Sequence, residues 1–301
     1  MKKNYIRQKP KNIKVWSKIA CGYSKLVVPN RPSDHDCANY AHYIYKILKD
    51  VNNPKIMLMG STPELRSILY TYTFKKKAQI FTVDLSADMH QAMREFVVPA
   101  TKPELKEEFF CGSWLKTNFP DNFFDLVVGD EVICNVCADQ HQNLFAEINR
   151  ILKNGGHWVT RHNFYLAENV KQSPKSIILN IVDNINDGKY TFQYSINILY
   201  LLLFYRLVID QAQHCVNVSD EIKVIKKILP NISNIKQRQT LKELLRVFEK
   251  YFGSYKNYYW YVLSKQESLK ELKDYFQFKG ELYAKDYLTV RHSPIWLLKK
   301  K

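Results

Sequence analysis

Short, unbroken apolar runs alternate with longer amphipathic stretches over residues 40–165. A strand buried on both faces of a sheet shows such a run, whereas a helix packed on the sheet is apolar along one side only. The apolar runs predict five strands, at residues 55–59, 78–83, 109–111, 124–130 and 157–161. The stretches between them predict helices at residues 65–74, 87–96 and 140–152. This alternation predicts a doubly wound α/β sheet that is mostly parallel.

The turn after the first predicted strand has features of a nucleotide-binding site. Gly60 ends the strand, and Ser61 and Thr62 lead into the next helix. Asp84 ends the second strand, 24 residues after Gly60. A glycine lets the backbone approach a ligand, a helix N-terminus offers free N–H groups, and an acid can accept hydrogen bonds from ribose hydroxyls. One glycine alone, however, is more typical of an ordinary buried β-α-β unit.

The carboxyl ends of the other predicted strands carry residues of the same kind. Small or polar residues end the third, fourth and fifth strands, at Gly112-Ser113, Gly129-Asp130 and Arg161-His162. Parallel α/β sheets bind their ligands outside the carboxyl ends of the strands. Together the five ends favour a ligand site at this edge over a unit that serves packing alone.

Outside the predicted sheet the chain is basic. The net charge is +16 over 301 residues, with +8 in residues 1–50, −1 in residues 51–166 and +9 in residues 167–301. A nucleic-acid groove is one explanation for basic flanks. We prefer the other explanation, solvated lysine-rich faces, because the lysines are scattered along helical patterns and few stand among aromatic residues.

Composition and cysteine spacing exclude several protein classes. A hydrophobic content of 46% and an aromatic content of 14% predict a folded protein. Residues 1–18 lack the apolar core of a signal peptide, and the longest apolar run, at 198–209, is too short to span a bilayer. Six irregularly spaced cysteines predict reduced thiols in a cytoplasmic protein. Cys134 and Cys137 form a CxxC pair without a second pair or a histidine cluster, so we expect no metal site.

Residues 166–270 lie outside the minimal sheet and read as helical. Four helical patterns cover residues 173–185, 194–214, 221–228 and 236–252. Aromatic residues gather near the end of this part, at Tyr251, Phe252, Tyr255, Tyr258, Tyr259, Trp260 and Tyr261. Ordinary core packing is the simpler interpretation of this cluster, and an aromatic lid over a small substrate is the other.

At the level of motifs, the chain resembles the class I S-adenosylmethionine-dependent methyltransferases over roughly residues 40–165. Five motifs carry the resemblance, in the order MGSTPEL (59–65), VDLS (83–86), CGSW (111–114), FDLVVGDEV (124–132) and INRILKNGGHWVTR (148–161). The Thr-Pro-Glu turn, the N-terminal tryptophan segment and the Arg31-Pro32-Ser33 turn are similar to a branch of the small-molecule type. The resemblance implies a Rossmann-like sheet with an antiparallel C-terminal edge strand and a helical insertion or cap.

The resemblance also implies where S-adenosylmethionine, the cofactor, would bind. Residues 60–62 would pass under its methionine part, Asp84 would bind the ribose, and Ser113 and Trp114 would border the adenine. Arg31 stands between two prolines and could lie over the ligand's carboxylate. The predicted cofactor-binding residues are Gly60, Ser61, Thr62, Glu64, Asp84, Leu85, Ser86, Met89, Gly112, Ser113, Trp114, Gly129, Asp130 and Arg31.

Three positions depart from the usual pattern of the family. Thr62 stands where a further glycine is usual, and Leu58 and Ser113 stand where acids are usual. For catalysis, Asp130 and Glu131 are the best candidates to orient or deprotonate the acceptor, because they lie at the end of the fourth strand. The alternative interpretation is that they are structural acids that cap the next segment. Weaker candidates at the same rim are Tyr23, His162 and Asn163.

The sequence thus predicts four parts. They are a basic N-terminal arm with helices over the cofactor site (1–50), the cofactor-binding core (51–165), a helical insertion or lid (166–270) and closing strands (271–301). We expect a cytoplasmic enzyme, a monomer or homodimer, that methylates a small molecule. The alternatives are an RNA methyltransferase that uses the basic flanks, and a non-methylating protein of the same fold that binds the cofactor.

Overall fold

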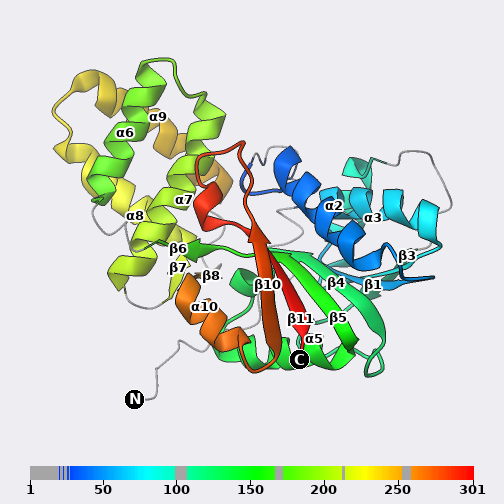
Figure 1. Ribbon diagram of the computed structural model, residues 1–301. Coiled ribbons are helices and arrows are strands. Elements are labelled where there is room, and N and C mark those ends of the chain that lie inside the picture. Colours follow the sequence, from blue (N-terminus) through cyan, green and yellow to red (C-terminus); the bar gives the residue numbers. More distant parts are fainter. Residues whose placement is uncertain are drawn as a thin grey trace.

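A seven-stranded sheet forms the centre of the computed structural model, which describes residues 20, 23, 26, 28–98, 107–166, 172–211, 214–252 and 259–301. Figure 1 shows its strands, which are β1 (Lys55–Met59), β2 (Gln79–Asp84), β3 (Glu107–Cys111), β4 (Phe124–Asp130), β5 (Leu152–Arg161), β10 (Phe276–Leu282) and β11 (Ile295–Lys300). Their order in the sheet is β10-β11-β5-β4-β1-β2-β3. All five strands predicted from the apolar runs are present.

The register of the central strands brings three carboxyl ends together. β1 pairs in parallel with β2 on one side and with β4 on the other. Met59, the last residue of β1, lies opposite Val83 in β2 and Gly129 in β4. The turn after β1 therefore begins between the ends of its two neighbours, which is the place where doubly wound sheets bind ligands.

One strand of the sheet is reversed. β11 runs antiparallel to both β5 and β10, and all other pairs of neighbours are parallel. The predicted fold class, a mostly parallel Rossmann-like sheet with an antiparallel C-terminal strand, is confirmed. In detail, β11 lies one place in from the edge, and β10 forms the edge itself.

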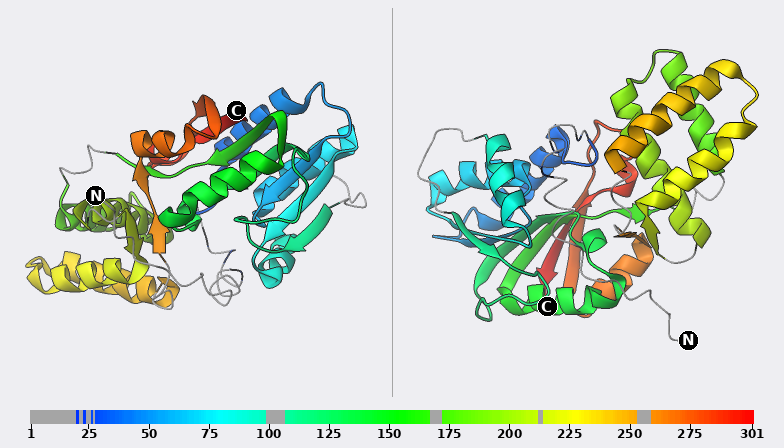
Figure 2. Two further views of the ribbon diagram at one scale, coloured as in Figure 1. Left: turned by 90° about the horizontal axis from the view of Figure 1, so that it is seen from below. Right: turned by 180° about the vertical axis from the view of Figure 1, so that it is seen from behind.

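Helices cover both faces of the sheet. On one face, α2 (Asp34–Leu48) and α3 (Pro63–Lys76) share a hydrophobic cluster with alternate residues of the strands, such as Leu58 and Val128. On the other face, α5 (His141–Ile151) and α10 (Lys265–Leu272) pack against the residues between them, such as Met59 and Val127. The short helix α4 (Ala87–Met93) follows β2 and continues into a 3₁₀ turn, η2 (Arg94–Phe96). Figure 2 shows the three layers from two further sides.

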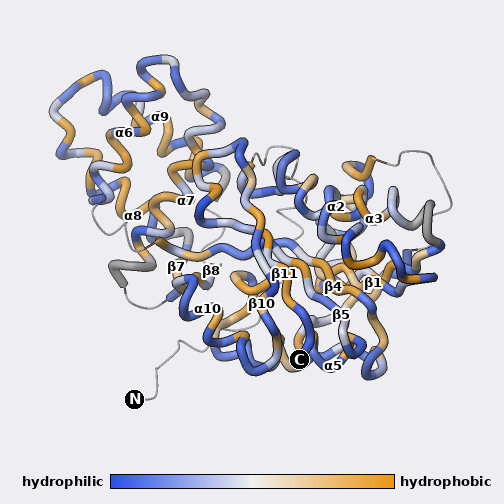
Figure 3. The backbone as a smooth tube through the Cα atoms, in the orientation of Figure 1, coloured by the Kyte–Doolittle hydropathy of each residue, from blue (hydrophilic) through white to orange (hydrophobic). Residues whose placement is uncertain are grey.

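Four further helices form a body of their own beside the sheet. They are α6 (Pro174–Asn186), α7 (Phe192–Gln211), α8 (Val218–Ile228) and α9 (Ile235–Phe252), as predicted from the helical patterns. Figure 1 shows them at the upper left. Their apolar residues form a cluster separate from those of the sheet, and Cys134, which follows β4, is the member that comes from the core. In Figure 3 apolar residues colour the inner strands, and the outer helices are mixed.

Two small sheets connect this helical body to the core. β6 (Phe164–Tyr165) pairs with β9 (Leu263–Ser264), and β7 (Cys215–Asn217) pairs with β8 (Tyr259–Tyr261). Among the described residues, no helix combines the length and the apolar character that a membrane span requires.

The structure differs from the sequence interpretation at one turn. The helix predicted at 140–152 and the strand predicted at 157–161 leave Gly155 and Gly156 between them. In the structure both glycines lie within β5, where an irregularity separates the Phe124–Leu152 pair from the Leu126–His157 pair. Gly155 has a φ of +81°, which lets the strand bend without a break.

The predicted aromatic cluster is divided between core and undescribed residues. Trp260 is buried in the helical body, where its ring contacts Tyr200 and Phe204 edge-on at centroid distances of 6.0 and 5.7 Å. Tyr261 is buried in a smaller cluster with Cys215. For these two residues the simpler interpretation, core packing, is confirmed. Tyr255 and Tyr258 lie outside the described residues.

Candidate functional site

The turn after β1 is held by two hydrogen bonds to one carbonyl. The backbone N–H of Gly60 and the indole Nε1–H of Trp114 both donate to the carbonyl oxygen of Val83, over 2.9 and 2.7 Å. Gly60 has a φ of +86°, a conformation that favours glycine. The Trp114 ring lies 3.5 Å from the position that a Cβ on Gly60 would take. The indole therefore forms one wall of this turn.

Asp84, at the end of β2, accepts hydrogen bonds on both carboxylate oxygens. The Ser61 hydroxyl donates to Oδ2 over 2.8 Å, and the Ser86 backbone N–H donates to Oδ1 over 3.0 Å. Burial raises the pKa of Asp84 above its usual value, and these hydrogen bonds oppose the rise. The backbone N–H groups of Ser61 and Leu85 also stabilise the charged form, so the carboxylate is held from the ends of both β1 and β2.

The residues around Asp84 complete this side of the site. Leu85 is 39% exposed, so its apolar side chain is accessible next to Asp84. The Ser86 hydroxyl caps α4 by accepting from the backbone N–H of Met89. Met89 is itself buried under Ala20 and Tyr23, so a part of the N-terminal region packs on α4.

Glu64 ties the N-terminal region to the start of α3. Its carboxylate accepts from the Tyr23 hydroxyl over 2.8 Å and from Arg31 Nε over 2.6 Å. The Arg31 guanidinium also lies over the Tyr23 ring, 5.0 Å from its centroid. Burial and the Glu64 charge raise the pKa of Tyr23. The guanidinium predicted to reach a ligand carboxylate thus binds a protein carboxylate.

A buried arginine gathers three acids at the ends of β4 and β5. Arg161 is fully buried, and its Nε and Nη2 donate to the two oxygens of Asp130 over 2.8 and 2.9 Å. Its Nη1 contacts Asp36 at 3.2 Å, and its Nη2 contacts Glu131 at 3.2 Å. Asp130 is thereby fixed by a two-point contact and serves to hold the arginine.

Glu131 contacts this shared cation at one point, as Asp36 does, and has a backbone conformation that is uncommon for a non-glycine residue. Its φ is +53°, and its backbone N–H donates to the Arg161 carbonyl oxygen over 3.1 Å. Burial raises the pKa of Glu131 to about 7, with a further rise from the nearby Asp130 charge, against the opposing pull of Arg161 and a hydrogen bond from Asn163. A carboxyl group with a pKa near neutrality can accept and release a proton at physiological pH.

One residue of the helical body, Tyr205, lies near Glu131. Tyr205 of α7 is fully buried, and its ring stacks on that of His292 at 4.1 Å between centroids. Burial and the nearby Glu131 charge raise the pKa of Tyr205. On the same helix, Asn197 accepts a hydrogen bond from Asn30, next to the Arg31 turn. α7 thus contacts the N-terminal region on one side and lies near the end of β4 on the other.

Several predicted site residues have structural roles in their local surroundings. Gly129 leaves room for Val132 and Met59, since a Cβ there would lie 2.4 Å from the Val132 side chain. The Ser113 hydroxyl accepts from the backbone N–H of Leu115. His162 bonds to Ser268 on α10, and burial lowers its pKa to about 3, so it is a neutral core residue.

Sequence reasoning missed the residues that organise this end of the site. Arg161 was recognised only as a strand end, and Asp36 and Tyr40 were not singled out. The backbone N–H of Arg161 donates to the Tyr40 hydroxyl over 2.8 Å. The spacing of four between Asp36 and Tyr40 places them on one helix face, and this was the available signal.

Comparison with known proteins gives a family for the central part of the chain. Residues 65–160 match the family described as methyltransferase domain. No curated protein sequence matches the chain.

Solved structures share the fold over nearly the whole chain. The PH0226 protein of Pyrococcus horikoshii is 16% identical, with 90% of this chain and 95% of that chain covered and a TM-score of 0.50. A SAM-dependent methyltransferase of Methanosarcina mazei is 13% identical, with 86% of this chain and 96% of that chain covered and a TM-score of 0.50. The N-methyltransferase NodS of Bradyrhizobium japonicum, solved with S-adenosylhomocysteine, is 8% identical, with 96% of this chain and 99% of that chain covered and a TM-score of 0.51.

At these identities the solved structures show a shared fold only. The sequence match shows which family the central part of the chain resembles. The match begins within α3 and ends one residue before the end of β5, and it includes Asp84 and the Asp130–Glu131 pair. Residues 65–160 are therefore similar to a methyltransferase domain, and the chain shares the fold of these solved structures.

Proposed function

We propose that the protein transfers a methyl group from S-adenosylmethionine directly to a small-molecule acceptor. The residues at the ends of β1 and β2 fit this cofactor. Asp84 offers a carboxylate at the end of β2, and an acid at this place can accept hydrogen bonds from ribose hydroxyls. Leu85 offers an exposed apolar side chain beside it, as an adenine ring requires. The Gly60 turn and the Trp114 wall would hold the rest of the molecule.

The single observation that carries the proposed reaction is the environment of Glu131. When bound, S-adenosylmethionine supplies a methyl group that is already electrophilic. The chain then has to position the acceptor, exclude water and remove a proton. Glu131 has a pKa of about 7, so a large fraction is ionised at neutral pH and can take the acceptor's proton. The buried Arg161 contacts both Asp130 and Glu131 and so fixes their positions.

The covered position of Glu131 supports a small acceptor. Glu131 is 7% exposed, and the buried Tyr205 of α7 is near enough for its pKa to respond to the Glu131 charge. A long polymer would need an open groove, whereas a small molecule needs only a pocket that closes around it. We propose accordingly that residues 166–270 act as a lid over the acceptor, with residues 1–50 closing the cofactor side.

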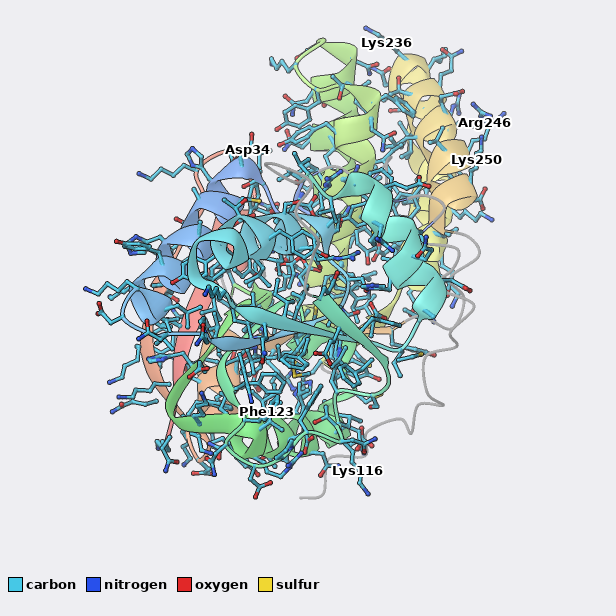
Figure 4. The ribbon with its side chains drawn as sticks, turned by 90° about the vertical axis from the view of Figure 1, so that its right-hand side faces the viewer. Asp34, Lys116, Phe123, Lys236, Arg246 and Lys250 are labelled. Carbon is cyan, nitrogen blue, oxygen red and sulfur yellow. The ribbon has the colours of Figure 1, made fainter. Side chains whose placement is uncertain are left out.

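A second candidate function, methylation of RNA, is favoured by one observation. Arg238, Lys242, Arg246 and Lys250 are all exposed and follow one another at intervals of four along α9. This spacing aligns them in a row along the helix. Figure 4 shows Arg246 and Lys250, with Lys236, pointing outward from α9. Such a row would contact phosphates without reading sequence.

Binding and turnover test the proposal in that order. Calorimetry with S-adenosylmethionine and S-adenosylhomocysteine should give a dissociation constant of roughly micromolar, about 8 kcal/mol. An untargeted assay of metabolite extracts with methyl-labelled cofactor should then label one small-molecule fraction. Glu131→Gln should bind the cofactor and lose transfer, while Glu108→Gln, which changes an exposed glutamate on β3, should keep both.

Two results would separate the alternatives. Labelled RNA in place of labelled metabolites would support the second candidate. Cofactor binding without any labelled product would support a protein of this fold that binds S-adenosylmethionine without methylating. An absence of binding at millimolar cofactor would reject all three.

A further inference from the structure

His90 of α4 lies between the cofactor side of the site and a buried arginine. Its Nδ1 is 3.3 Å from the hydroxyl oxygen of Ser61, and its Nε2 is 3.5 Å from Nη2 of Arg66. The imidazole ring stacks on Phe109 of β3, with 4.0 Å between centroids and 17° between planes. The ring is therefore fixed in orientation, with one nitrogen toward Ser61 and the other toward Arg66.

The arginine decides which nitrogen carries the proton. Arg66 is 1% exposed, donates to Glu107 over 2.7 Å and to the His90 carbonyl oxygen over 3.2 Å, and stays charged at any working pH. A proton on Nε2 would point at this cation, whereas a lone pair on Nε2 is attracted to it. The ring therefore carries its single proton on Nδ1.

The serine can then point in one direction only. The Ser61 hydroxyl has one hydrogen and two polar neighbours, His90 Nδ1 and Asp84 Oδ2, the latter at 2.8 Å. Since Nδ1 donates to the serine oxygen, the serine hydrogen goes to Asp84. If the tautomer were reversed, the hydroxyl would turn to His90 and present a lone pair to the carboxylate.

We propose that His90 is a positioning residue for cofactor binding, which directs the Ser61 hydroxyl at Asp84 and so fixes the carboxylate for a ribose. This inference rests on the proposed function, which gives Asp84 the ribose. His90 contacts Ser61, and Ser61 in turn bonds to Asp84, so the effect of His90 on the cofactor would pass through these two residues. The low pKa of His90, about 4 because of burial and the Arg66 charge, keeps the ring neutral at working pH.

The first experiment reads the tautomer in the protein without ligand. Histidine labelled with ¹⁵N is incorporated, and long-range proton–nitrogen correlation distinguishes a protonated ring nitrogen from a bare one. His90→Phe, which keeps an aromatic ring on Phe109, assigns the signal by its loss. We expect Nδ1 protonated and Nε2 bare. A signal from an Nε2–H tautomer would overturn the proposed order of hydrogen bonds from His90 through Ser61 to Asp84, whatever the protein binds.

The second experiment measures S-adenosylhomocysteine affinity by calorimetry. His90→Phe should weaken binding by between about twofold and about tenfold, the range of one neutral hydrogen bond. His90→Asn places an amide N–H where Nδ1–H was and should recover most of the loss. In a Ser61→Ala background, His90→Phe should have no further effect, because the hydroxyl that links His90 to Asp84 is already absent.

The pattern across these variants separates positioning from packing. A packing role for His90 would give equal losses in the parent and in the Ser61→Ala background and no recovery with asparagine, and this result would overturn the proposal. Thermal melts show which variants are folded, and the tautomer measurement does not depend on them. A parent protein that binds no S-adenosylhomocysteine would reject the proposed function and with it the ribose role. The Nδ1–H result would stand or fall separately.

Discussion

The hydroxyl of Tyr40 accepts a hydrogen bond from the backbone N–H of Arg161 over 2.8 Å and donates one to the carbonyl oxygen of Gly129 over 2.9 Å. One side chain from α2 thus joins the carboxyl ends of β4 and β5, where the two candidate catalytic acids begin. The position of Glu131 depends on this joint, because its backbone N–H bonds to the Arg161 carbonyl oxygen.

Removing this hydroxyl should destabilise the protein. Tyr40→Phe leaves the Arg161 N–H and the Gly129 carbonyl without this partner inside the core, so the free energy of unfolding should fall by about 1–3 kcal/mol. Denaturant unfolding measures the change. Tyr45→Phe, on the same helix but 62% exposed, should change it by less than about 0.5 kcal/mol. Equal stability of the two variants would show that the joint contributes nothing.

The ribose assignment predicts a specific loss at Asp84. Asp84→Ala should weaken S-adenosylhomocysteine binding by about 1.5–3 kcal/mol, because charge-assisted hydrogen bonds to the hydroxyls are lost. Asp139→Ala, which removes an exposed aspartate, is the matched control and should bind like the parent. The assignment is wrong if calorimetry gives the same affinity for both variants.

The pKa of Glu131 predicts a pH dependence. The general base must be ionised, and burial raises its pKa to about 7, so the rate of transfer should rise as the pH increases through about 7 and level off above it. Glu131→Gln should remove this dependence together with most of the activity. Transfer rates measured with labelled cofactor from roughly pH 5.5 to pH 9, which is one to two units on either side of this pKa, test the prediction. A profile that falls with increasing pH would contradict the role.

Charge removal along α9 tests the RNA alternative. If Arg238, Lys242, Arg246 and Lys250 only face solvent, replacing all four by glutamine should leave weak, salt-dependent oligonucleotide binding much as before. If they contact phosphates, the slope of log affinity against log salt should fall by up to about three to four. The matched control replaces four exposed lysines elsewhere, namely Lys46, Lys49, Lys116 and Lys279. A loss confined to the α9 variant would favour RNA.

The buried aromatic ring of β8 should behave as a core residue. Trp260→Ala removes a side chain packed between Tyr200 and Phe204, so the free energy of unfolding should fall by about 3–5 kcal/mol. Tyr259, its half-buried neighbour, is the comparison, because a lid residue should alter turnover more than stability. A Trp260→Ala protein that melts like the parent but turns over slowly would reverse this interpretation.

The sheet was predictable because its strands are buried on both faces. Residues 56–59 and 126–128 are fully or almost fully buried, so selection for an apolar run at each position leaves a clear pattern. Their polar ends were equally visible, since Asp84 and Asp130 directly follow such runs. The bend at Gly155 was harder to predict, because a glycine with positive φ is as typical of a turn as of an irregular strand.

The interactions within the site were not predictable from spacing along the chain. Arg161 meets Asp36 across 125 positions of sequence, and neither residue carries a local pattern that names the other. Arg31 illustrates the same difficulty, since its position between prolines suggested a ligand contact while its guanidinium binds Glu64. A charge can be placed from sequence on an element, but its partner is set by the packing of other elements.

The reversed strand also has a consequence for the growing chain. β11 fills the place between β5 and β10, yet Ile295 is synthesised 134 residues after Arg161. At the usual pace of translation, that interval lasts roughly 7 to 27 seconds. During this time the edge of β5, with the apolar Trp158 and Val159, has no neighbour on that side. A nascent chain would therefore expose an adhesive strand edge while the helical body is still being made, which makes this interval the natural point for a chaperone to engage.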